Sequence, residues 1–174
     1  MQSYVGHLLV AAPPLIDPHF WRTVVLMIQH DEDATAGVVL NRPTLERVED
    51  HLDAWARLVP EPGLVHYGGP VEPQVAIAIV SGDEGEPTGL PGVSLGDLSE
   101  ERMPSGGQAR IYAGYSGWGE GQLEAEIREG SWYVVPASPS DPFDPPEEQW
   151  TRVLRRQRGY LALVSTFPDD VNLN

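Results

Sequence analysis

The sequence predicts one domain, residues 1–174, in which short strands are mixed with short helices. Continuous apolar runs bounded by turn residues recur along the chain and are typical of buried strands. The 18 glycines and 17 prolines indicate many turns between short elements. A chain of this length buries roughly 70% of its unfolded surface, so we expect a core that needs no disulfide bonds.

The N-terminal part is predicted to contain three strands. Residues 5–12 form the first and end at two prolines, and an Asp-Pro turn follows. Residues 23–28 are a continuous apolar run, typical of a strand that is buried on both faces. A polar loop of about five residues separates this run from residues 36–41, which predicts an antiparallel hairpin.

Residues 44–59 are predicted to form an amphipathic helix. Apolar side chains recur at helical spacing from Leu45 to Val59, Thr44 is a suitable N-cap residue, and a proline follows. Two strands come next, at residues 64–67 and 75–80. Residues 82–110 are predicted to be an exposed acidic loop with a short strand or turn at residues 93–98.

The most distinctive stretch is GYSGWGEGQLEAEI at residues 114–127. Four of its first eight residues are glycines, interleaved with Tyr115 and Trp118. Glycine is used where the backbone needs a positive φ or a close approach. We therefore predict that a strand at residues 110–113 leads into a packed strand-to-helix turn. A helix at residues 122–129 follows and ends at Gly130.

The C-terminal part is predicted to hold a strand at residues 132–136, a helix and a last apolar element at residues 161–165. The helix begins after Asp144, with Pro145 as its first residue. One face of this helix carries a basic patch, which consists of Arg152, Arg155 and Arg156. The simplest interpretation of the patch is a solvated face or a set of ion pairs with carboxylates.

Composition excludes several kinds of chemistry. Cysteine is absent, so thiolate nucleophiles and Cys-ligated metal sites are excluded, and the absence of lysine removes the P-loop and Schiff-base lysines. The net charge of −15 disfavours direct binding of nucleic acid. No apolar run reaches the roughly 18 residues of a membrane span. We expect a cytoplasmic protein with no cofactor and no resident metal.

Two patterns suggest catalysis, and each has a simpler interpretation. Ser116 lies in a sequence close to the Gly-x-Ser-x-Gly nucleophile elbow, but Trp118 replaces the second glycine. The alternative is a turn serine that bonds to the backbone. His30 and Asp31 at a strand end are the best candidates for a base or a ligand. The alternative is a turn histidine bonded to a carbonyl group.

A third pattern concerns two strand-end turns. The turn at Asn41 and Arg42 and the turn at Gly68 and Gly69 both offer exposed backbone amides. Arg42 is a candidate to hold an anionic ligand beside the glycine turn. An arginine bonded to a core carboxylate is at least an equal alternative.

Four motifs resemble those of the YqgE/AlgH family of bacterial proteins. The first is GHLLVA at residues 6–11 with LxDPxFxRTV at residues 15–24, where x is a position outside the motif, and the second is His30-Asp31 with GVVLNRP at residues 37–43. The third is YGGPV at residues 67–71, and the fourth is the stretch at residues 114–127. They span nearly the whole chain in the family's order. Relatives commonly have alanine at the position of Ser116, which argues against a serine nucleophile.

The resemblance implies an α+β fold, in which a bifurcated, mostly antiparallel sheet curls into a pseudo-barrel flanked by helices. It implies no known reaction, although a role linked to transcription has been suggested for the family. We therefore expect a non-enzymatic protein that binds a small molecule or a protein partner, with a hydrolase based on Ser116 or on His30 and Asp31 as the alternative. The expected ligand-binding residues are Asn41, Arg42, Gly68, Gly69, Tyr115, Ser116, Trp118 and Gln122.

Overall fold

The computed structural model describes residues 2–99 and 103–169, and the strands within these ranges form a ten-stranded sheet. The sheet order is β10-β1-β2-β3-β9-β6-β8-β7, and β4 and β5 branch off β9. The strands are β1 (His7–Ala11), β2 (Val24–His30), β3 (Thr35–Val39), β4 (Pro43–Arg47), β5 (Leu64–Tyr67), β6 (Val71–Ser81), β7 (Glu86–Pro87), β8 (Val93–Gly96), β9 (Ala109–Trp118) and β10 (Trp132–Pro136). The helices are η1 (Val48–Asp50), α1 (Asp53–Ala56), α2 (Gln122–Arg128), η3 (Asp141–Phe143), α3 (Gln149–Arg155) and α4 (Tyr160–Val164).

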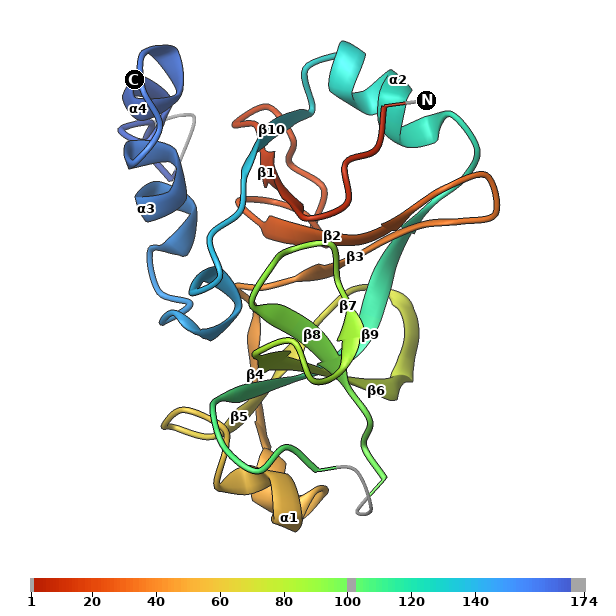
Figure 1. The fold of residues 1–174 in the computed structure, drawn as a ribbon. Coiled ribbons are helices and arrows are strands. Elements are labelled where there is room, and N and C mark those ends of the chain that lie inside the picture. The colour runs from red at the N-terminus through yellow and green to blue at the C-terminus, as the bar shows by residue number, and fades with distance from the viewer. Residues whose placement is uncertain (1, 100–102, 170–174) are drawn as a thin grey trace.

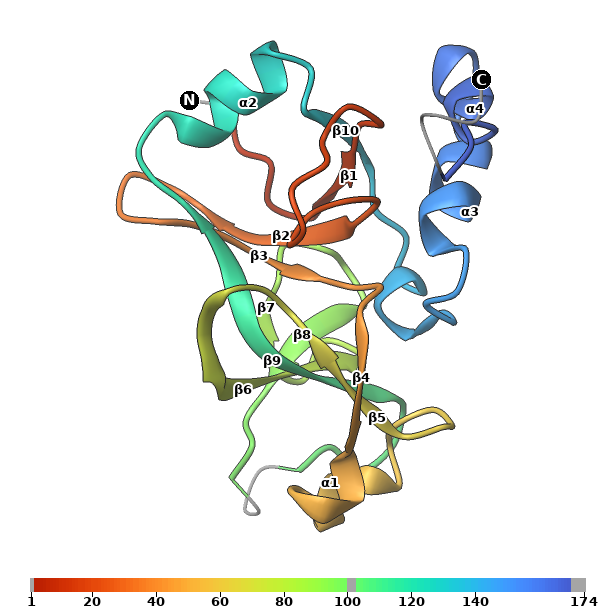
Figure 2. The ribbon, with the colours of Figure 1, turned by 180° about the vertical axis from the view of Figure 1, so that it is seen from behind.

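The sheet divides at β9. The first part of this strand pairs antiparallel with β6 and parallel with β5, whereas its end pairs antiparallel with β3. The other pairings between the described strands are antiparallel. The sheet curls into a half-barrel, with α2 and α1 at opposite ends and α3 and α4 along one side (Figures 1 and 2). This arrangement confirms the expected α+β fold with a bifurcated sheet.

The hairpin of β2 and β3 confirms the prediction from the apolar run. Val24 and Leu26 of β2 pack into one core cluster, and Val25 and Met27 pack into a second cluster on the opposite face. Because both faces of β2 are buried, its sequence shows no alternation of polar and apolar residues. The strands expected at residues 5–12, 64–67, 75–80 and 132–136 and the helix at residues 122–129 are likewise present.

The predicted helix over residues 44–59 is wrong in its first half. Residues 43–47 form β4, which pairs with β5, and the Thr44 hydroxyl donates to the Val65 carbonyl at 2.7 Å instead of capping a helix. Leu45, which the helical pattern counted as a core position, is 96% exposed. Pairing between strands distant in sequence therefore overrode a local periodicity. Only the short η1 and α1 follow.

Three further expectations need correction. β9 continues through Trp118, so the predicted turn at residues 114–118 is strand, and the turn begins at Gly119. α3 begins at Gln149 rather than at Pro145: Pro146 disfavours a helical conformation at Pro145, and Glu148 just before the helix is left-handed, with a φ of +58°. Residues 82–99 are more ordered than the predicted exposed loop, since they contain the strands β7 and β8 and the buried Thr88. Residues 100–102 of the predicted acidic loop lie outside the described residues.

Candidate functional site

The predicted glycine turn lies where two backbones cross. The Gly68 N–H donates to the Ala113 carbonyl at 2.8 Å, and a Cβ atom at Gly68 would lie 2.2 Å from the Gly114 oxygen. A Cβ atom at Gly69 would lie 2.2 Å from the Tyr115 oxygen, and one at Gly114, whose φ is +73°, would lie 2.6 Å from the Gly69 oxygen. Gly68, Gly69 and Gly114 thus form an interlocked joint, which we call the glycine crossing.

Ser116 belongs to this joint. Its side chain is fully buried, and its hydroxyl donates to the Gly68 carbonyl at 3.2 Å. A carbonyl oxygen accepts the hydroxyl proton but cannot remove it, so this contact does not activate the serine. The arrangement matches the backbone-bonded serine and offers no support for a nucleophile.

Asn41 and Arg42 hold the loop between β1 and β2. The Asn41 side chain donates to the Arg22 carbonyl and accepts from the Val24 N–H, each at 2.9 Å. The Arg42 guanidinium donates to the Trp21 carbonyl, and burial lowers the pKa of Arg42. The Arg42 side chain therefore bonds to backbone rather than reaching toward the glycine turn.

Trp118 and Gln122 take part in an aromatic cluster beneath α2. The indole N–H groups of Trp118 and Trp132 both donate to one Glu126 carboxylate oxygen at 2.9 Å, and Gln122 donates to the other oxygen at 2.9 Å. The Phe20 ring lies 6.2 Å from Trp118 and 5.5 Å from Trp132, measured between ring centroids. Glu126 thus satisfies two buried indoles and fixes α2 over the sheet.

Tyr115 and Trp118 also line a pocket of about 460 Å³ between the β2–β3 hairpin and the end of β9. Its other walls include Ile28, Gln29, Asp33, Val71, Ile77 and Gly117. Partial desolvation and a hydrogen bond to Glu72 raise the pKa of Tyr115. Of the eight predicted residues, Tyr115 and Trp118 meet at this pocket, whereas the others lie in the glycine crossing, against the β1–β2 loop or in the aromatic cluster.

His30 links three segments of the chain. Its Nδ1 accepts from the Tyr4 N–H at 3.1 Å, so the proton of the neutral ring lies on Nε2, which donates to Glu124 at 2.8 Å. The Tyr4 ring stacks on His30 with 5.2 Å between centroids. Asp31 accepts from the backbone of Ala34 and Asp33 and from Gln29, and these bonds lower its pKa.

A pocket of about 460 Å³ lies beside His30 and has an acidic rim. The His30 side chain itself is only 1% exposed and both ring nitrogens are engaged, so it lacks a free nitrogen to serve as a base. Among the residues that the structure describes, no group of three or more His, Cys, Asp or Glu side chains is placed to hold a metal ion.

Sequence reasoning missed a buried pair between β5 and β9. Arg110 is 4% exposed and donates to the His66 Nε2 at 3.0 Å and to the Phe143 carbonyl at 3.1 Å, while His66 Nδ1 donates to the Leu40 carbonyl at 3.0 Å. Burial and the neighbouring Arg110 lower the pKa of His66 to about 4. No local pattern could reveal the pair, because its members are 44 residues apart.

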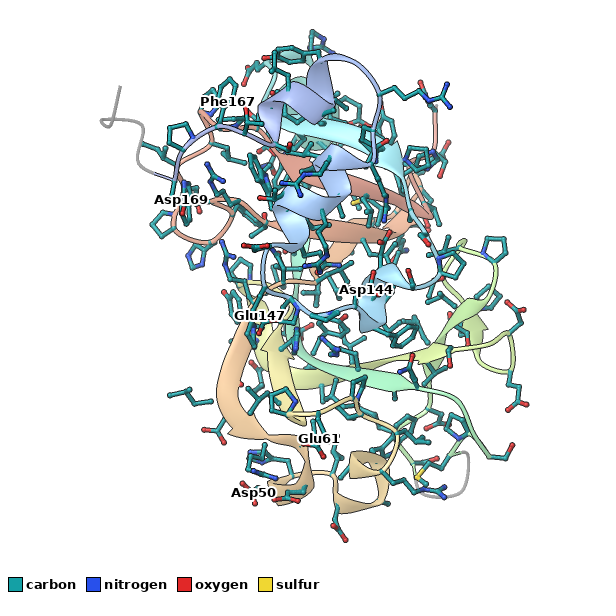
Figure 3. All side chains as sticks on the ribbon, turned by 90° about the vertical axis from the view of Figure 1, so that its left-hand side faces the viewer. Asp50, Glu61, Asp144, Glu147, Phe167 and Asp169 are labelled. Atoms are coloured by element: carbon teal, nitrogen blue, oxygen red, sulfur yellow. The ribbon has the colours of Figure 1, made fainter. Side chains whose placement is uncertain are left out.

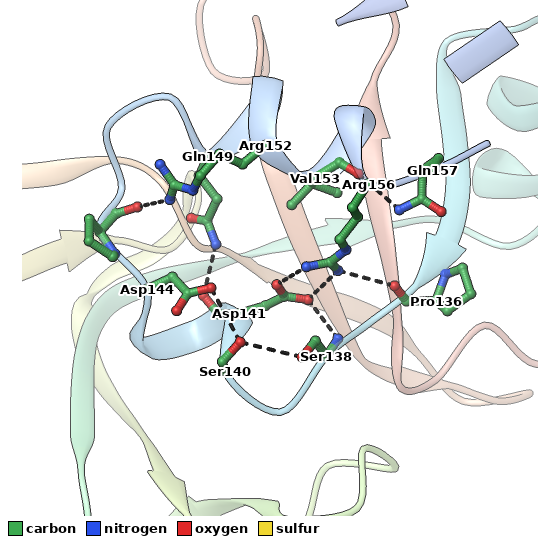
Figure 4. Close-up of polar contacts among 11 residues, drawn as sticks. Pro136, Ser138, Ser140, Asp141, Asp144, Gln149, Arg152, Val153, Arg156 and Gln157 are labelled. Atoms are coloured by element: carbon green, nitrogen blue, oxygen red, sulfur yellow. Dashed lines mark hydrogen bonds and ion pairs between the residues drawn. The ribbon is translucent and has the colours of Figure 1, made fainter. Parts of the chain in front are cut away.

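A second missed network encloses η3 (Figure 4). The Asp141 carboxylate is buried and accepts from both terminal nitrogens of Arg156, at 2.6 and 2.7 Å, and from the Ser138 N–H at 2.6 Å. Gln149 donates to the Asp141 carbonyl at 2.8 Å. Arg156 of the predicted basic patch is thus an ion-pair residue, which agrees with the simpler interpretation of that patch.

Comparison with known proteins gives consistent matches along the chain. A family model described as AlgH-like matches residues 8–162. The UPF0301 protein SCO2948 of Streptomyces coelicolor is 50% identical, over 100% of this chain and 97% of its own. A UPF0301 protein of Thermobifida fusca is 42% identical, over 99% of this chain and 96% of its own.

Two solved structures resemble the fold. The crystal structure of protein DIP2367 from Corynebacterium diphtheriae superimposes with a TM-score of 0.83 at 32% identity and covers 96% of this chain and 94% of that one. The solution structure of the AlgH protein from Pseudomonas aeruginosa gives a TM-score of 0.69 at 26% identity, with 97% of this chain and 98% of that one covered.

Proposed function

This chain belongs to the AlgH-like family, and we propose that it is a non-enzymatic binding protein that takes a small ligand in the pocket beside Tyr115 and Trp118. The observation that carries the proposal is the meeting of these two predicted aromatic residues at one pocket of about 460 Å³. That volume suits a small metabolite. No helix among residues 2–99 and 103–169 is long and apolar enough to cross a membrane. The cytoplasmic location expected from the sequence remains part of the proposal.

The lining of the pocket indicates the chemistry of the ligand. Ile28, Val71 and Ile77 supply an apolar wall, and Gln29 and Asp33 supply polar groups at the edge. Asp33 and the net charge of −15 both favour a neutral or cationic ligand over an anion. We therefore expect a compound with an apolar body and a hydrogen-bond donor or amine group.

We extend the proposal to a regulatory role on the resemblance to the family alone. Binding of the ligand would then be sensed by a protein partner, because the net charge of −15 disfavours direct contact with nucleic acid. A protein partner that itself occupies the pocket is the alternative form of the same proposal.

Gly117 allows a direct test. It is exposed in the pocket wall, and an added Cβ would meet its nearest neighbour, the Val71 Cγ2, at 3.6 Å, which is ordinary contact. Gly117→Ala therefore fills part of the pocket without disturbing the backbone. Gly106→Ala is the matched control, because its Cβ would meet nothing within 4 Å and Gly106 does not line the pocket.

The experiment is a thermal-shift screen of neutral and cationic metabolites, followed by calorimetric titration of the hits. We expect a ligand that stabilises the wild type, binds Tyr115→Ala and Gly117→Ala at least severalfold more weakly, and binds Gly106→Ala with unchanged affinity. A screen without a hit, or a hit that binds Gly117→Ala as tightly as the wild type, would count against the pocket.

A further inference from the structure

Arg22 stands at the end of the β1–β2 loop in an unusual backbone conformation. Its φ is +52°, in the left-handed region that residues other than glycine rarely adopt. The conformation is maintained from the β3–β4 junction, where Asn41 donates to the Arg22 carbonyl at 2.9 Å and Arg42 donates to the Trp21 carbonyl. Strained residues that neighbouring contacts hold in place are a recurrent feature of ligand-binding sites.

The Arg22 side chain lies against two indole rings. Its guanidinium carbon is 4.1 Å from the centroid of the Trp150 ring and 5.5 Å from that of Trp21. Trp150 is itself fixed, because its indole N–H donates to the Ala11 carbonyl at 2.8 Å. The Arg22 side chain is 13% exposed, so the guanidinium is oriented before any ligand arrives.

The C-terminal segment of the same chain occupies this guanidinium. One terminal nitrogen of Arg22 donates to the carbonyls of Phe167 and Pro168, at 2.8 and 2.7 Å, and the other lies 3.2 Å from the Asp169 carboxylate. Figure 3 shows Phe167 and Asp169 at one end of the molecule, opposite Asp50 and Glu61. The AlgH-like match includes Arg22 and Trp150 but ends at residue 162, before this segment.

We propose that Arg22, Trp21 and Trp150 form a carboxylate-binding site, which residues 167–169 occupy as an internal substitute for an external ligand. A guanidinium is planar and matches two carboxylate oxygens, and the buried Trp150 indole holds the guanidinium in place. The present occupant offers a carboxylate and two carbonyls, which are the groups of an acidic peptide. The site is separate from the pocket beside Tyr115 and does not depend on it.

The carboxylate contact of the internal segment is the part that an external carboxylate can replace most readily. The Asp169 side chain is 85% exposed, and an ion pair with so exposed a partner contributes little. The net charge of −15 repels anions at a distance, so an external carboxylate has to be selected by contact with Arg22. At physiological ionic strength this repulsion is largely screened beyond about 8 Å. The test is therefore carried out at physiological ionic strength.

Nuclear magnetic resonance of the full ¹⁵N-labelled chain tests the competition. The probes are sodium acetate and the peptide acetyl-Phe-Pro-Asp-amide, each compared with sodium chloride at equal ionic strength. We expect a saturable shift of the Trp150 indole N–H signal. We also expect a fall in the heteronuclear NOE of Phe167 and Asp169 as the segment leaves. If acetate and the peptide give these changes at similar midpoint concentrations, the natural ligand is a small carboxylic acid. If the midpoint concentration of the peptide is much lower than that of acetate, the natural ligand is an acidic peptide. Both results support the site.

Three variants sharpen the result. Arg22→Gln should abolish both responses, and Arg158→Gln, at an exposed arginine after α3, should keep them. Because Arg22 packs on Trp150 and its loss can disturb folding, Asp169→Asn provides a surface change that leaves the core intact. It weakens the internal occupant and should lower the acetate midpoint about two- to fivefold. The proposal fails if chloride reproduces the shifts, if Arg22→Gln responds like the wild type, or if Asp169→Asn leaves the midpoint unchanged.

Discussion

Replacement of Gly114 by alanine should destabilise the protein strongly, because the glycine crossing has no room for a side chain. The φ of +73° costs a residue with a Cβ about 1–2 kcal/mol. The new Cβ would lie 2.6 Å from the Gly69 oxygen, 2.8 Å from the Val71 oxygen and 3.0 Å from the Pro73 Cα. All three atoms are backbone, so relief requires β6 to move away from β9, and such overpacking typically costs about 1–3 kcal/mol.

Loss of glycine also restricts the unfolded chain, which offsets about 0.4–1 kcal/mol. The net expectation for Gly114→Ala is therefore a loss of roughly 2–4 kcal/mol in the free energy of unfolding. Urea titration followed by tryptophan fluorescence measures it, with an unchanged m-value as the check that the comparison is valid. Gly117→Ala, three residues along the same strand, is the control and should stay within about 1 kcal/mol of the wild type. Equal stability of the two variants would refute the reasoning.

Three further predictions concern buried polar groups. His66 has a pKa of about 4 when folded against 6.5 as its ordinary value, so the unfolded chain binds the proton first. Stability should fall by up to roughly 3 kcal/mol as the pH drops from about 6.5 to 4, and His66→Gln should flatten that slope in urea titrations across this range. Glu126→Ala strands two indole N–H groups and should cost about 2–4 kcal/mol in chemical unfolding, whereas a cost below about 1 kcal/mol would contradict the shared acceptor. Arg156→Met leaves the buried Asp141 carboxylate without its cation. Because the Arg156 side chain is 37% exposed, water can partly replace it, and we expect the free energy of unfolding to fall by roughly 1–3 kcal/mol in calorimetry. An unchanged free energy of unfolding would count against the ion pair.

The sequence correctly predicted elements whose own residues determine their structure, either because both faces are buried or because the segment carries its own helix signals. The strand β2 can be predicted without knowing which strands it pairs with, because a strand buried on both faces is apolar throughout. The helix α2 carries its own signals, with Leu123 on the buried face and Gly130 after its end at a φ of +85°. Both elements are specified within about ten residues of sequence.

Two of the failures involve partners that are distant in sequence. The period of apolar residues after Pro43 fits a helix, but β5 supplies a strand partner, with Thr44 bonded to Val65 21 residues away, and Leu45 is left exposed. The glycines at 114 and 117 resemble turn residues. Gly114 instead permits the close approach of Gly69, and Gly117 sits in a regular strand. Sequence alone identifies a position that requires glycine without revealing which backbone approaches it.

The same limit explains the candidate site. Motif residues were expected to converge through their side chains, but Arg42 donates to Trp21 and Trp118 donates to Glu126, and neither partner can be read from the local pattern. The turns are neighbours in the fold, as expected, because the Tyr67 N–H donates to the Arg42 carbonyl at 2.7 Å. Proximity of motifs was predictable in part, whereas the direction of each side chain was not.

The glycine crossing connects the segments that carry the motifs. On one side of it, Tyr115 follows Gly114 directly along β9 and faces the proposed ligand pocket. On the other side, Gly68 follows Tyr67, whose backbone bonds to Arg42, which in turn holds the loop that carries Arg22. A rigid backbone joint therefore separates the pocket from the Arg22 site and fixes the position of each. Because Gly117 and the Arg22 side chain contact no residue in common among those that the structure describes, the variants Gly117→Ala and Arg22→Gln should act independently. The first should alter ligand binding alone, and the second should alter the carboxylate response alone.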